Sequence, residues 1–248
     1  DILKCKVANY GKGLLYRKGS VVVQFVLSLA LMITSFIIYK QVAYFQNKDL
    51  GINVDQVIVV ERPKKNVKQY DDRAQSFKDK LISYVQVEAV SVSGSIPSGG
   101  FNWSTSSLKR TDKSQAGESE QGISITYIDN AYYDVYQPEI VAGSAQYKGE
   151  DTSLKALINE SALAPLKFES ADEAIDKLVS TSEISIKIIG VIKNYNHRSL
   201  KVNVEPALYL LNNNPNYFSI RYNTGNAPLA STKKVLDVVQ REYKQAFP

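Results

Sequence analysis

The stretch VVVQFVLSLALMITSFIIY, from Val21 to Tyr39, decides how the chain is organised, because it holds no charged residue and no proline. With Gly19 and Ser20 it reaches about 30 Å as an α-helix, which is the thickness of a bilayer's hydrocarbon core. A helix buried in the core of a soluble protein rarely contains such a long stretch without a charged residue. A cleaved signal peptide has an apolar run of about 7–15 residues before a small-residue cleavage site. The following KQVAYFQNKDLG offers no such site, so the stretch predicts a transmembrane helix.

The charges on either side of this stretch predict its orientation. Five Lys or Arg residues precede it, and only Lys40 and Lys48 follow it closely. The positive-inside rule then makes residues 1–19 a cytoplasmic basic flank and places everything after about Tyr39 outside the cytoplasm. The single cysteine, Cys5, lies in this flank, so the chain can form no intrachain disulfide.

The helix is expected to continue beyond the membrane. Lys40–Leu50 contains no helix breaker, Val42 and Phe45 continue the apolar spacing, and Gly51 is a natural C-terminal stop. We therefore predict one helix over residues 20–50, whose last turns project from the membrane as a stalk.

After Gly51, strand and helix patterns alternate irregularly, which predicts an α+β domain. The first strand, helix and strand form a β-α-β unit, and the final helix carries an inward stripe of Leu229, Thr232, Leu236, Val239 and Tyr243. The expected elements are strand 56–61, helix 70–84, strand 87–96, strand 123–128, helix 130–136, strand 139–142, strand 157–159 leading into a helix from residue 160, helix 171–179, strands 183–193, 208–211 and 218–222, and a helix from residue 228.

The composition changes in the middle of the domain. Pro97–Gly122 is rich in Ser, Gly and Thr, which predicts a long mobile excursion with short strands. Trp103 stands alone in it and is compatible with two roles. It either anchors a binding partner or pins its own loop to the core. The change in composition suggests two lobes, one of residues 51–96 and 183–248 and an inserted one of residues 97–182.

No pattern typical of catalysis or metal binding is present. The chain has neither GxxxxGK[ST] nor GxGxxG, and one His with one Cys gives no zinc ligand set. The carboxylates that come nearest to a cluster, Asp71–Asp72 and Glu118 with Glu120, lack EF-hand spacing and are interpreted as solvated surface.

His197 is the only histidine and so the only imidazole that could act as an acid or base. A serine-hydrolase interpretation would pair it with Ser199 or a distant serine, but no GxSxG is present, and a structural role in a turn is favoured. We therefore predict no catalytic, cofactor-binding or metal-binding residue, leave substrate-binding residues unassigned, and expect that the chain is not an enzyme. The net charge of +5 is concentrated in the basic flank, which argues against nucleic-acid binding.

Several ordered segments resemble a known family. Arg17–Gly51 (RKGSVVVQFVLSLALMITSFIIYKQVAYFQNKDLG) resembles the first helix and stalk of MacB/FtsX-type ABC-transporter permeases, most closely the second repeat of the long, duplicated permeases. This chain departs from the family's sequence pattern at two positions. Ser144 follows Gly143 where the family usually has Gly-Arg, and Asn194 occupies a position where the family often has Asp. Further matches, in the family's order, are Val90–Gly100 (VSVSGSIPSGG), Tyr127–Gly143 (YIDNAYYDVYQPEIVAG), Leu157–Leu166 (LINESALAPL), Ile189–Leu200 (IGVIKNYNHRSL) and Glu205–Pro206.

The resemblance implies a periplasmic domain on the inner (cytoplasmic) membrane. Residues 51–96 and 183–248 would form a porter-like lobe, and residues 97–182 the smaller inserted lobe. It implies a non-catalytic permease that couples ATP hydrolysis by a cytoplasmic ABC ATPase, on a separate chain, to movement of the periplasmic domain. Such coupling serves export, lipoprotein handling or mechanotransmission.

The resemblance also implies partners. These are other permease transmembrane segments, in a homodimer or pseudo-dimer, and a periplasmic adaptor or lipoprotein. Because family members have further membrane helices after this domain, the chain is expected to be part of a longer protein. Two alternatives stay open: a membrane-anchored extracytoplasmic sensor or ligand-binding domain, and a scaffold subunit of an envelope complex.

Overall fold

The computed structural model describes most of the chain and divides it into two units, residues 1–49 and 50–248. In its described residues, 7–47, the first unit is a single helix, and the second unit is an α+β domain. The described residues are 7–47, 51–64, 67–97, 99–112, 122–147, 149, 153–181, 184–195, 197, 203–212, 216–225 and 228–248.

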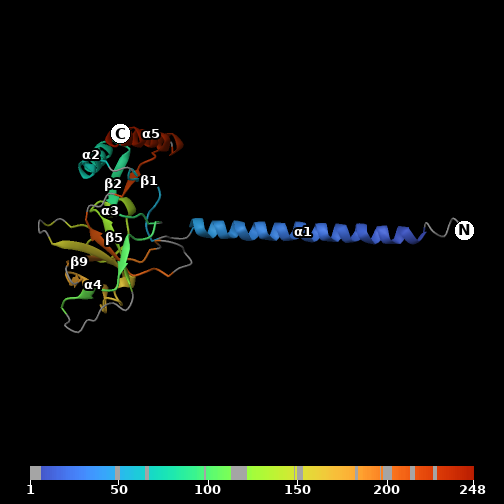
Figure 1. Cartoon of the computed structure of the whole chain (residues 1–248), viewed down its shortest axis with the longest axis horizontal. Coiled ribbons are helices and arrows are strands. Elements are labelled where there is room, and N and C mark those ends of the chain that lie inside the picture. The colour runs from blue at the N-terminus through green and yellow to red at the C-terminus, as the bar shows by residue number, and fades with distance from the viewer. Residues whose placement is uncertain are drawn as a thin grey trace. The chain divides into compact units, whose positions relative to one another are not determined.

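Helix α1, Val7–Asn47, is one unbroken helix (Figure 1). Within it, Tyr16–Ala43 is long and apolar enough to cross a membrane, and no residue of its most apolar window is buried by the rest of the protein. The helix begins at Val7 rather than near the predicted residue 20, because the glycines of the basic flank weaken a helix without ending it and no proline intervenes. The predicted helix end at residues 48–50 and Cys5 lie outside the described residues.

The domain is built on one mixed sheet, which has eleven strands in the described part of the chain. The strand order is β1-β11-β2-β5-β10-β7-β9-β8-β4, with β3 paired to β5 and β6 paired to β9. The strands are β1 Val57–Glu61, β2 Val87–Ser93, β3 Trp103–Thr105, β4 Lys109–Arg110, β5 Ile123–Ile128, β6 Ile140–Gly143, β7 Leu154–Asn159, β8 Leu178–Ser180, β9 Ser185–Ile192, β10 Ala207–Leu211 and β11 Tyr217–Tyr222.

Among the described helices of the domain, only the first and the last are longer than two turns. They are α2 Tyr70–Ile82, α3 Tyr132–Tyr136, the 3-10 turn η1 Glu160–Ala162, α4 Ala171–Ala174 and α5 Pro228–Ala246. The helix predicted from Glu160 is therefore only one 3-10 turn.

Strands β1 and β2 are both antiparallel to β11, which lies between them. The predicted β-α-β unit is therefore present but split by the last strand of the chain. Helices α2 and α5 lie side by side at this end of the domain (Figure 1). Phe77 of α2 is buried and packs edge-on against Phe218 of β11, with ring centroids 5.0 Å apart, and against Phe247 at 5.8 Å.

The inward stripe of α5 differs from the predicted one. Val239 is buried and Tyr243 packs against the same core, as expected. Leu236, however, is 39% exposed, and Val235 and Glu242 are buried instead. The side chain of Leu229 lies outside the described residues. The helix is therefore turned so that a charged residue faces the core, which an apolar pattern alone does not predict.

The other core lies under β5, β7, β9 and β10, where Ile125, Ile158, Ile188 and Leu208 are buried together. A third cluster contains buried tyrosines from α3, from β10 and from the segment after β9. In β10, Ala207 and Tyr209 belong to it and alternate with Leu208 and Leu210 of the second core, so it lies on the opposite face of the sheet. Because one sheet runs through all three, the boundaries 51–96, 97–182 and 183–248 stay a prediction.

One predicted helix is wrong over half its length. Residues 171–179 were expected to be helical, yet α4 ends at Ala174 and Leu178–Ser180 forms β8. Ile175 is extended and Asp176 has a left-handed φ of 63°, which ends the helix. The residues beyond gain a hydrogen-bonded partner in β9, which a short isolated helix could not provide.

Gly143 ends β6 at a close approach of two strands. Its φ is +75°, and a Cβ at this position would lie 2.3 Å from the carbonyl oxygen of Ile189 in β9. The Ser144 amide donates to that same oxygen at 2.9 Å. The turn therefore needs glycine at 143, whatever residue follows it.

Replacing Gly143 with alanine is expected to destabilise the domain by at least about 2 kcal/mol, because it forces a left-handed backbone and a contact with β9. The measurement is urea unfolding of the detergent-solubilised chain, followed by the fluorescence of Trp103. Gly122→Ala is the matched control, since a Cβ added there would meet nothing within 4 Å and its φ is ordinary. Equal effects of the two changes would contradict this account.

Candidate functional site

His197 lies inside the aromatic cluster. It is 6% exposed, and its Nε2 shares a hydrogen bond of 2.8 Å with the Tyr209 hydroxyl. Its ring packs between Phe101 and Tyr195, with centroids 4.2 and 4.4 Å away. These are the contacts of a packed side chain, and Ser199 lies outside the described residues.

The carboxylates considered as metal ligands do not converge in the described parts of the chain. Asp71 and Asp72 are exposed in the first turn of α2, where negative charge complements the helix dipole. No group of three or more His, Cys, Asp or Glu residues is arranged to hold a metal ion among the described residues. Glu118 and Glu120 lie outside them.

Trp103 combines features of both roles proposed for it. It is 44% exposed, and its indole N–H donates to the Tyr127 hydroxyl at 3.3 Å. Strand β3 is fixed to β5 through the pair Trp103–Ile125. The side chain is thus attached to its own sheet and also open to solvent, so its role stays a prediction.

A few of the residues that carry the family resemblance meet where β7 and β9 end and β10 begins. The Asn159 side chain donates to the Glu205 carbonyl and accepts from the Ala207 amide, both at 2.8 Å. Glu160 accepts from the Asn194 amide at 2.9 Å, and the Asn194 Oδ1 accepts from the Ser161 amide at 3.0 Å. An aspartate at 194 would offer the same oxygen, so this departure preserves the contact. These side chains tie strand ends together rather than forming a reactive site.

The residues that follow α1 form a distinct site, which we call the entry segment, residues 51–56. The Asn53 amide donates to the Tyr136 carbonyl at 2.8 Å, and its side chain donates to Gln137 at 3.0 Å. Gly51 has a φ of +78°, and a Cβ there would lie 3.0 Å from the Asn194 carbonyl oxygen. The entry segment is therefore fixed closely against the rest of the domain.

Arg221, on β11, holds the entry segment in place. The residue is 6% exposed. Its Nη2 donates to the Asn53 carbonyl at 2.7 Å, and its Nη1 donates to the Asp55 carbonyl at 3.2 Å. Its Nε donates to the Val135 carbonyl, in α3, at 2.6 Å. One guanidinium therefore joins β11, α3 and the entry segment.

The surroundings of Arg221 explain how its charge is tolerated. No ion pair joins it to a carboxylate among the described residues, so the carbonyl oxygens compensate the cost of burying it. Tyr136 lies nearby, with its hydroxyl 2.7 Å from Ser219 Oγ. Burial raises the pKa of the Tyr136 phenol, and the Ser219 hydrogen bond and the Arg221 charge partly oppose this.

The role of Arg221 was not recognised from the sequence, although a signal exists. In YFSIRY it is the only charged residue of a strand that is otherwise buried or half-buried. A lone charge within such a strand needs buried partners. The sequence does not say that those partners are carbonyls more than eighty positions away.

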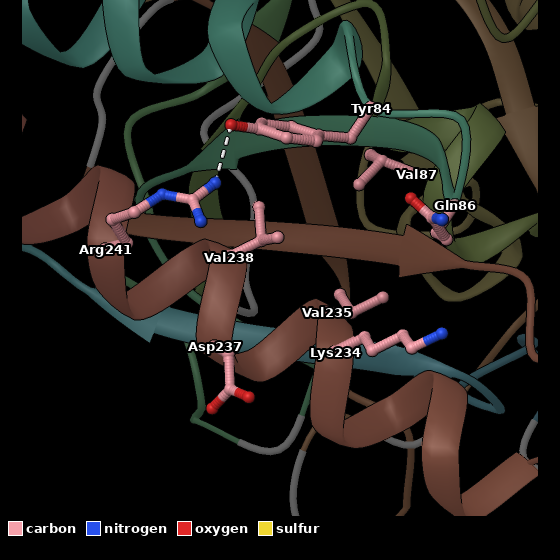
Figure 2. Close-up of a pocket in the computed structure, with 8 residues that line it drawn as sticks. All are labelled: Tyr84, Gln86, Val87, Lys234, Val235, Asp237, Val238 and Arg241. Carbon is pink, nitrogen blue, oxygen red and sulfur yellow. Dashed lines mark hydrogen bonds between the residues drawn. The ribbon is translucent and has the colours of Figure 1, made fainter.

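A pocket of about 280 Å³ lies between α5 and the turn that joins α2 to β2 (Figure 2). We call it the α5 pocket. Val87, Val235 and Val238 supply its apolar side chains, and the Tyr84 ring lies across one end. Its lining residues are Tyr84, Gln86, Val87, Lys234, Val235, Asp237, Val238 and Arg241.

A buried carboxylate supports one end of this pocket. The Tyr84 hydroxyl donates to Glu242 Oε1 at 2.8 Å and accepts from Arg241 Nη2 at 2.9 Å, the bond drawn in Figure 2. Lys80 lies 2.8 Å from Glu242 Oε2. Lys80 above all, with Tyr84 and Arg241, lowers the pKa of the Glu242 carboxyl from 4.5 to about 2.

Arg221→Met is expected to remove three hydrogen bonds and leave buried carbonyls unpaired, at a cost of about 3 kcal/mol. Hydrogen exchange of the Asn53 amide should accelerate more than that of β9 amides, because the change acts on the entry segment. Mass spectrometry of deuterium uptake measures both. Arg62→Met, which removes one exposed hydrogen bond to Asn216 and a cation–π contact with Tyr70, is the control and should leave exchange at Asn53 unchanged.

The ionised Glu242 is expected to stabilise the domain above about pH 4.5, and this contribution should disappear as the pH falls towards 2. Glu242→Gln should therefore be less stable than the unmodified chain at pH 7 and approach it near pH 2. Urea unfolding at a series of pH values measures this difference. A difference that stays constant from pH 7 to pH 2 would refute the linkage.

Comparisons with known proteins agree with this geometry at the level of fold. No protein-family model matches the sequence, and a search of curated proteins gives no match. The periplasmic region of MacB from Actinobacillus actinomycetemcomitans is similar with a TM-score of 0.50 and 14% identity, over 77% of this chain and 85% of that one. The extracellular domain of the noncanonic ABC-type transporter YknZ from Gram-positive bacteria gives 0.46 and 12%, over 76% and 95%. The conclusion rests on the first: the α+β domain that follows the apolar helix has the fold of the periplasmic region of MacB.

Proposed function

We propose that the chain is a non-catalytic permease subunit of an ABC transporter of the MacB/FtsX type. The observation that carries the proposal is an apolar helix directly followed by a domain with the MacB periplasmic fold. The proposed location is the inner membrane, with the N-terminus in the cytoplasm and the domain in the periplasm. The basic residues before the helix support this orientation.

The proposed work of the chain is mechanical. ATP hydrolysis on a separate, cytoplasmic ABC ATPase moves the membrane helices, and α1 carries this displacement to the entry segment. Arg221 supports this step, because its contacts to Asn53 and Asp55 continue to Val135. A pull on the entry segment therefore acts on β11 and α3 together instead of unravelling the first strand.

The proposal includes a division of labour within the domain. Residues 51–96 and 183–248 form the porter-like lobe that receives the displacement, and residues 97–182 form the inserted lobe. The apolar cluster around Phe77 and Phe218 supports the porter-like lobe, because all of its buried members lie in residues 51–96 and 183–248. A second permease half and a periplasmic adaptor or lipoprotein complete the assembly.

The first test of the function is purification of the full-length protein from membranes in mild detergent, followed by mass spectrometry of the proteins that accompany it. We expect a P-loop ATPase to co-purify, because the chain has no nucleotide-binding motif of its own. An unrelated single-span protein purified in parallel is the control. Reproducible absence of any ATPase would contradict the permease and favour an anchored sensor or scaffold.

A second test concerns the coupling. Four glycines inserted between Tyr44 and Phe45 should abolish any nucleotide-dependent change in hydrogen exchange at Asn53, because a flexible segment does not transmit displacement. Hydrogen exchange of the purified complex is measured once in the presence of ATP and once in the presence of ADP. Four alanines at the same place add about one helical turn and keep the helix, so they should preserve the change. Loss in both variants, or in neither, would contradict transmission through the helix.

A further inference from the structure

We propose that the α5 pocket is a docking surface for an extracytoplasmic protein partner, which inserts one apolar side chain and places a neighbouring carboxylate against Lys234 and Arg241. The extracytoplasmic location of the partner rests on the proposed function. The chemistry of the partner rests on the pocket itself.

The size and lining of the pocket fit a single side chain. Its volume, about 280 Å³, is at the lower limit of the range of small-molecule sites. Val87 faces Val235 and Val238 across it (Figure 2), so an aliphatic group would be surrounded on two sides. A large cofactor would not fit.

The charges around the pocket favour an anion. In Figure 2 the carboxylate of Asp237 points away from Tyr84 and Val87, whereas the Arg241 guanidinium lies beside the Tyr84 ring. Arg241 uses its Nε and Nη2 for Glu242 and Tyr84. Among the described residues, no hydrogen bond or ion pair involves its Nη1 or the Lys234 ammonium. Both groups can therefore bind a carboxylate.

Exposed apolar side chains beside the pocket favour a protein over a free small molecule. Val85 stands between the lining residues Tyr84 and Gln86 and is 94% exposed. Ile82, two residues before Tyr84, is 46% exposed. A small molecule inside the pocket would leave these side chains in water, whereas a protein segment lying across it would cover them.

The pocket wall is held in shape before any partner binds. Tyr84 is fixed by its two hydrogen bonds to Glu242 and Arg241, and Glu242 is in turn held by Lys80. Binding therefore needs little ordering of these side chains, which favours affinity from a short segment.

The test uses the full chain in lipid nanodiscs, without the ATPase, and a fluorescein-labelled peptide Ser-Leu-Asp-Ser-Leu-Asp-Ser as probe. Fluorescence anisotropy should show saturable binding that weakens about tenfold when both Asp residues of the probe are replaced by Asn. Replacing both Leu residues of the probe by Ser should weaken it by a similar factor. Equal binding of the three peptides would overturn the proposal.

Two pairs of variants locate the binding. Lys234→Glu should weaken it about fivefold, whereas Lys233→Glu, the same charge change on an exposed neighbour that does not line the pocket, should leave it within twofold. Val85→Ser should weaken binding about threefold, and Val141→Ser, at a distant exposed position, should not. Equal effects within either pair would overturn the assignment of the surface.

A competition experiment distinguishes a protein partner from a small anion as the ligand of the pocket. Hexanoate should compete with the probe only weakly, because it cannot cover Val85 and Ile82. Complete displacement by hexanoate, with no effect of Val85→Ser, would make the pocket a site for small anions and refute the docking surface. The peptide-binding experiments do not depend on co-purification of an ATPase. The docking surface and the permease function can therefore be refuted independently of each other.

Discussion

The domain depends on the way a single buried guanidinium is satisfied. Arg221 donates to the carbonyls of Asn53, Asp55 and Val135, and so it joins the first residues of the domain to its last strand and to α3. Removing such a charge from water is costly unless its donors find acceptors. The native fold provides these acceptors only when the three segments lie together, so the same contact that stabilises the domain also fixes the place where the chain enters it.

The split arrangement of the sheet makes this contact possible. Because β11 lies between β1 and β2, the last strand of the domain is paired with its first two long strands. Helices α2 and α5 then cover the same apolar cluster, and Phe77, Phe218 and Phe247 meet across them. A displacement of the entry segment would thus act on β1, β11 and β2 together, which is what the proposed transmission of force requires.

The polar side chains of the domain are mostly committed to holding it together. Asn159, Glu160 and Asn194 connect strand ends, and His197 is packed among aromatic rings. Around the α5 pocket, by contrast, the Lys234 ammonium and the Arg241 Nη1 have no partner among the residues that the structure describes, and Val85, in the turn beside the pocket, is exposed. This contrast between satisfied and available groups separates the structural clusters from the proposed docking surface.

The sequence by itself determined the features that depend on local patterns. Composition alone specified the apolar helix, local sequence patterns predicted strands at β1, β2, β5 and β9, and the family resemblance predicted the MacB-like fold. The tertiary structure alone decided that β11 separates β1 from β2, that Leu178–Ser180 pairs with β9 instead of extending α4, and that Glu242 faces the core in place of Leu236. The physical reason is the range of each interaction. Periodicity depends on residues that are close together in the sequence. The partners that allow Arg221 and Glu242 to be buried come from positions far away in the chain.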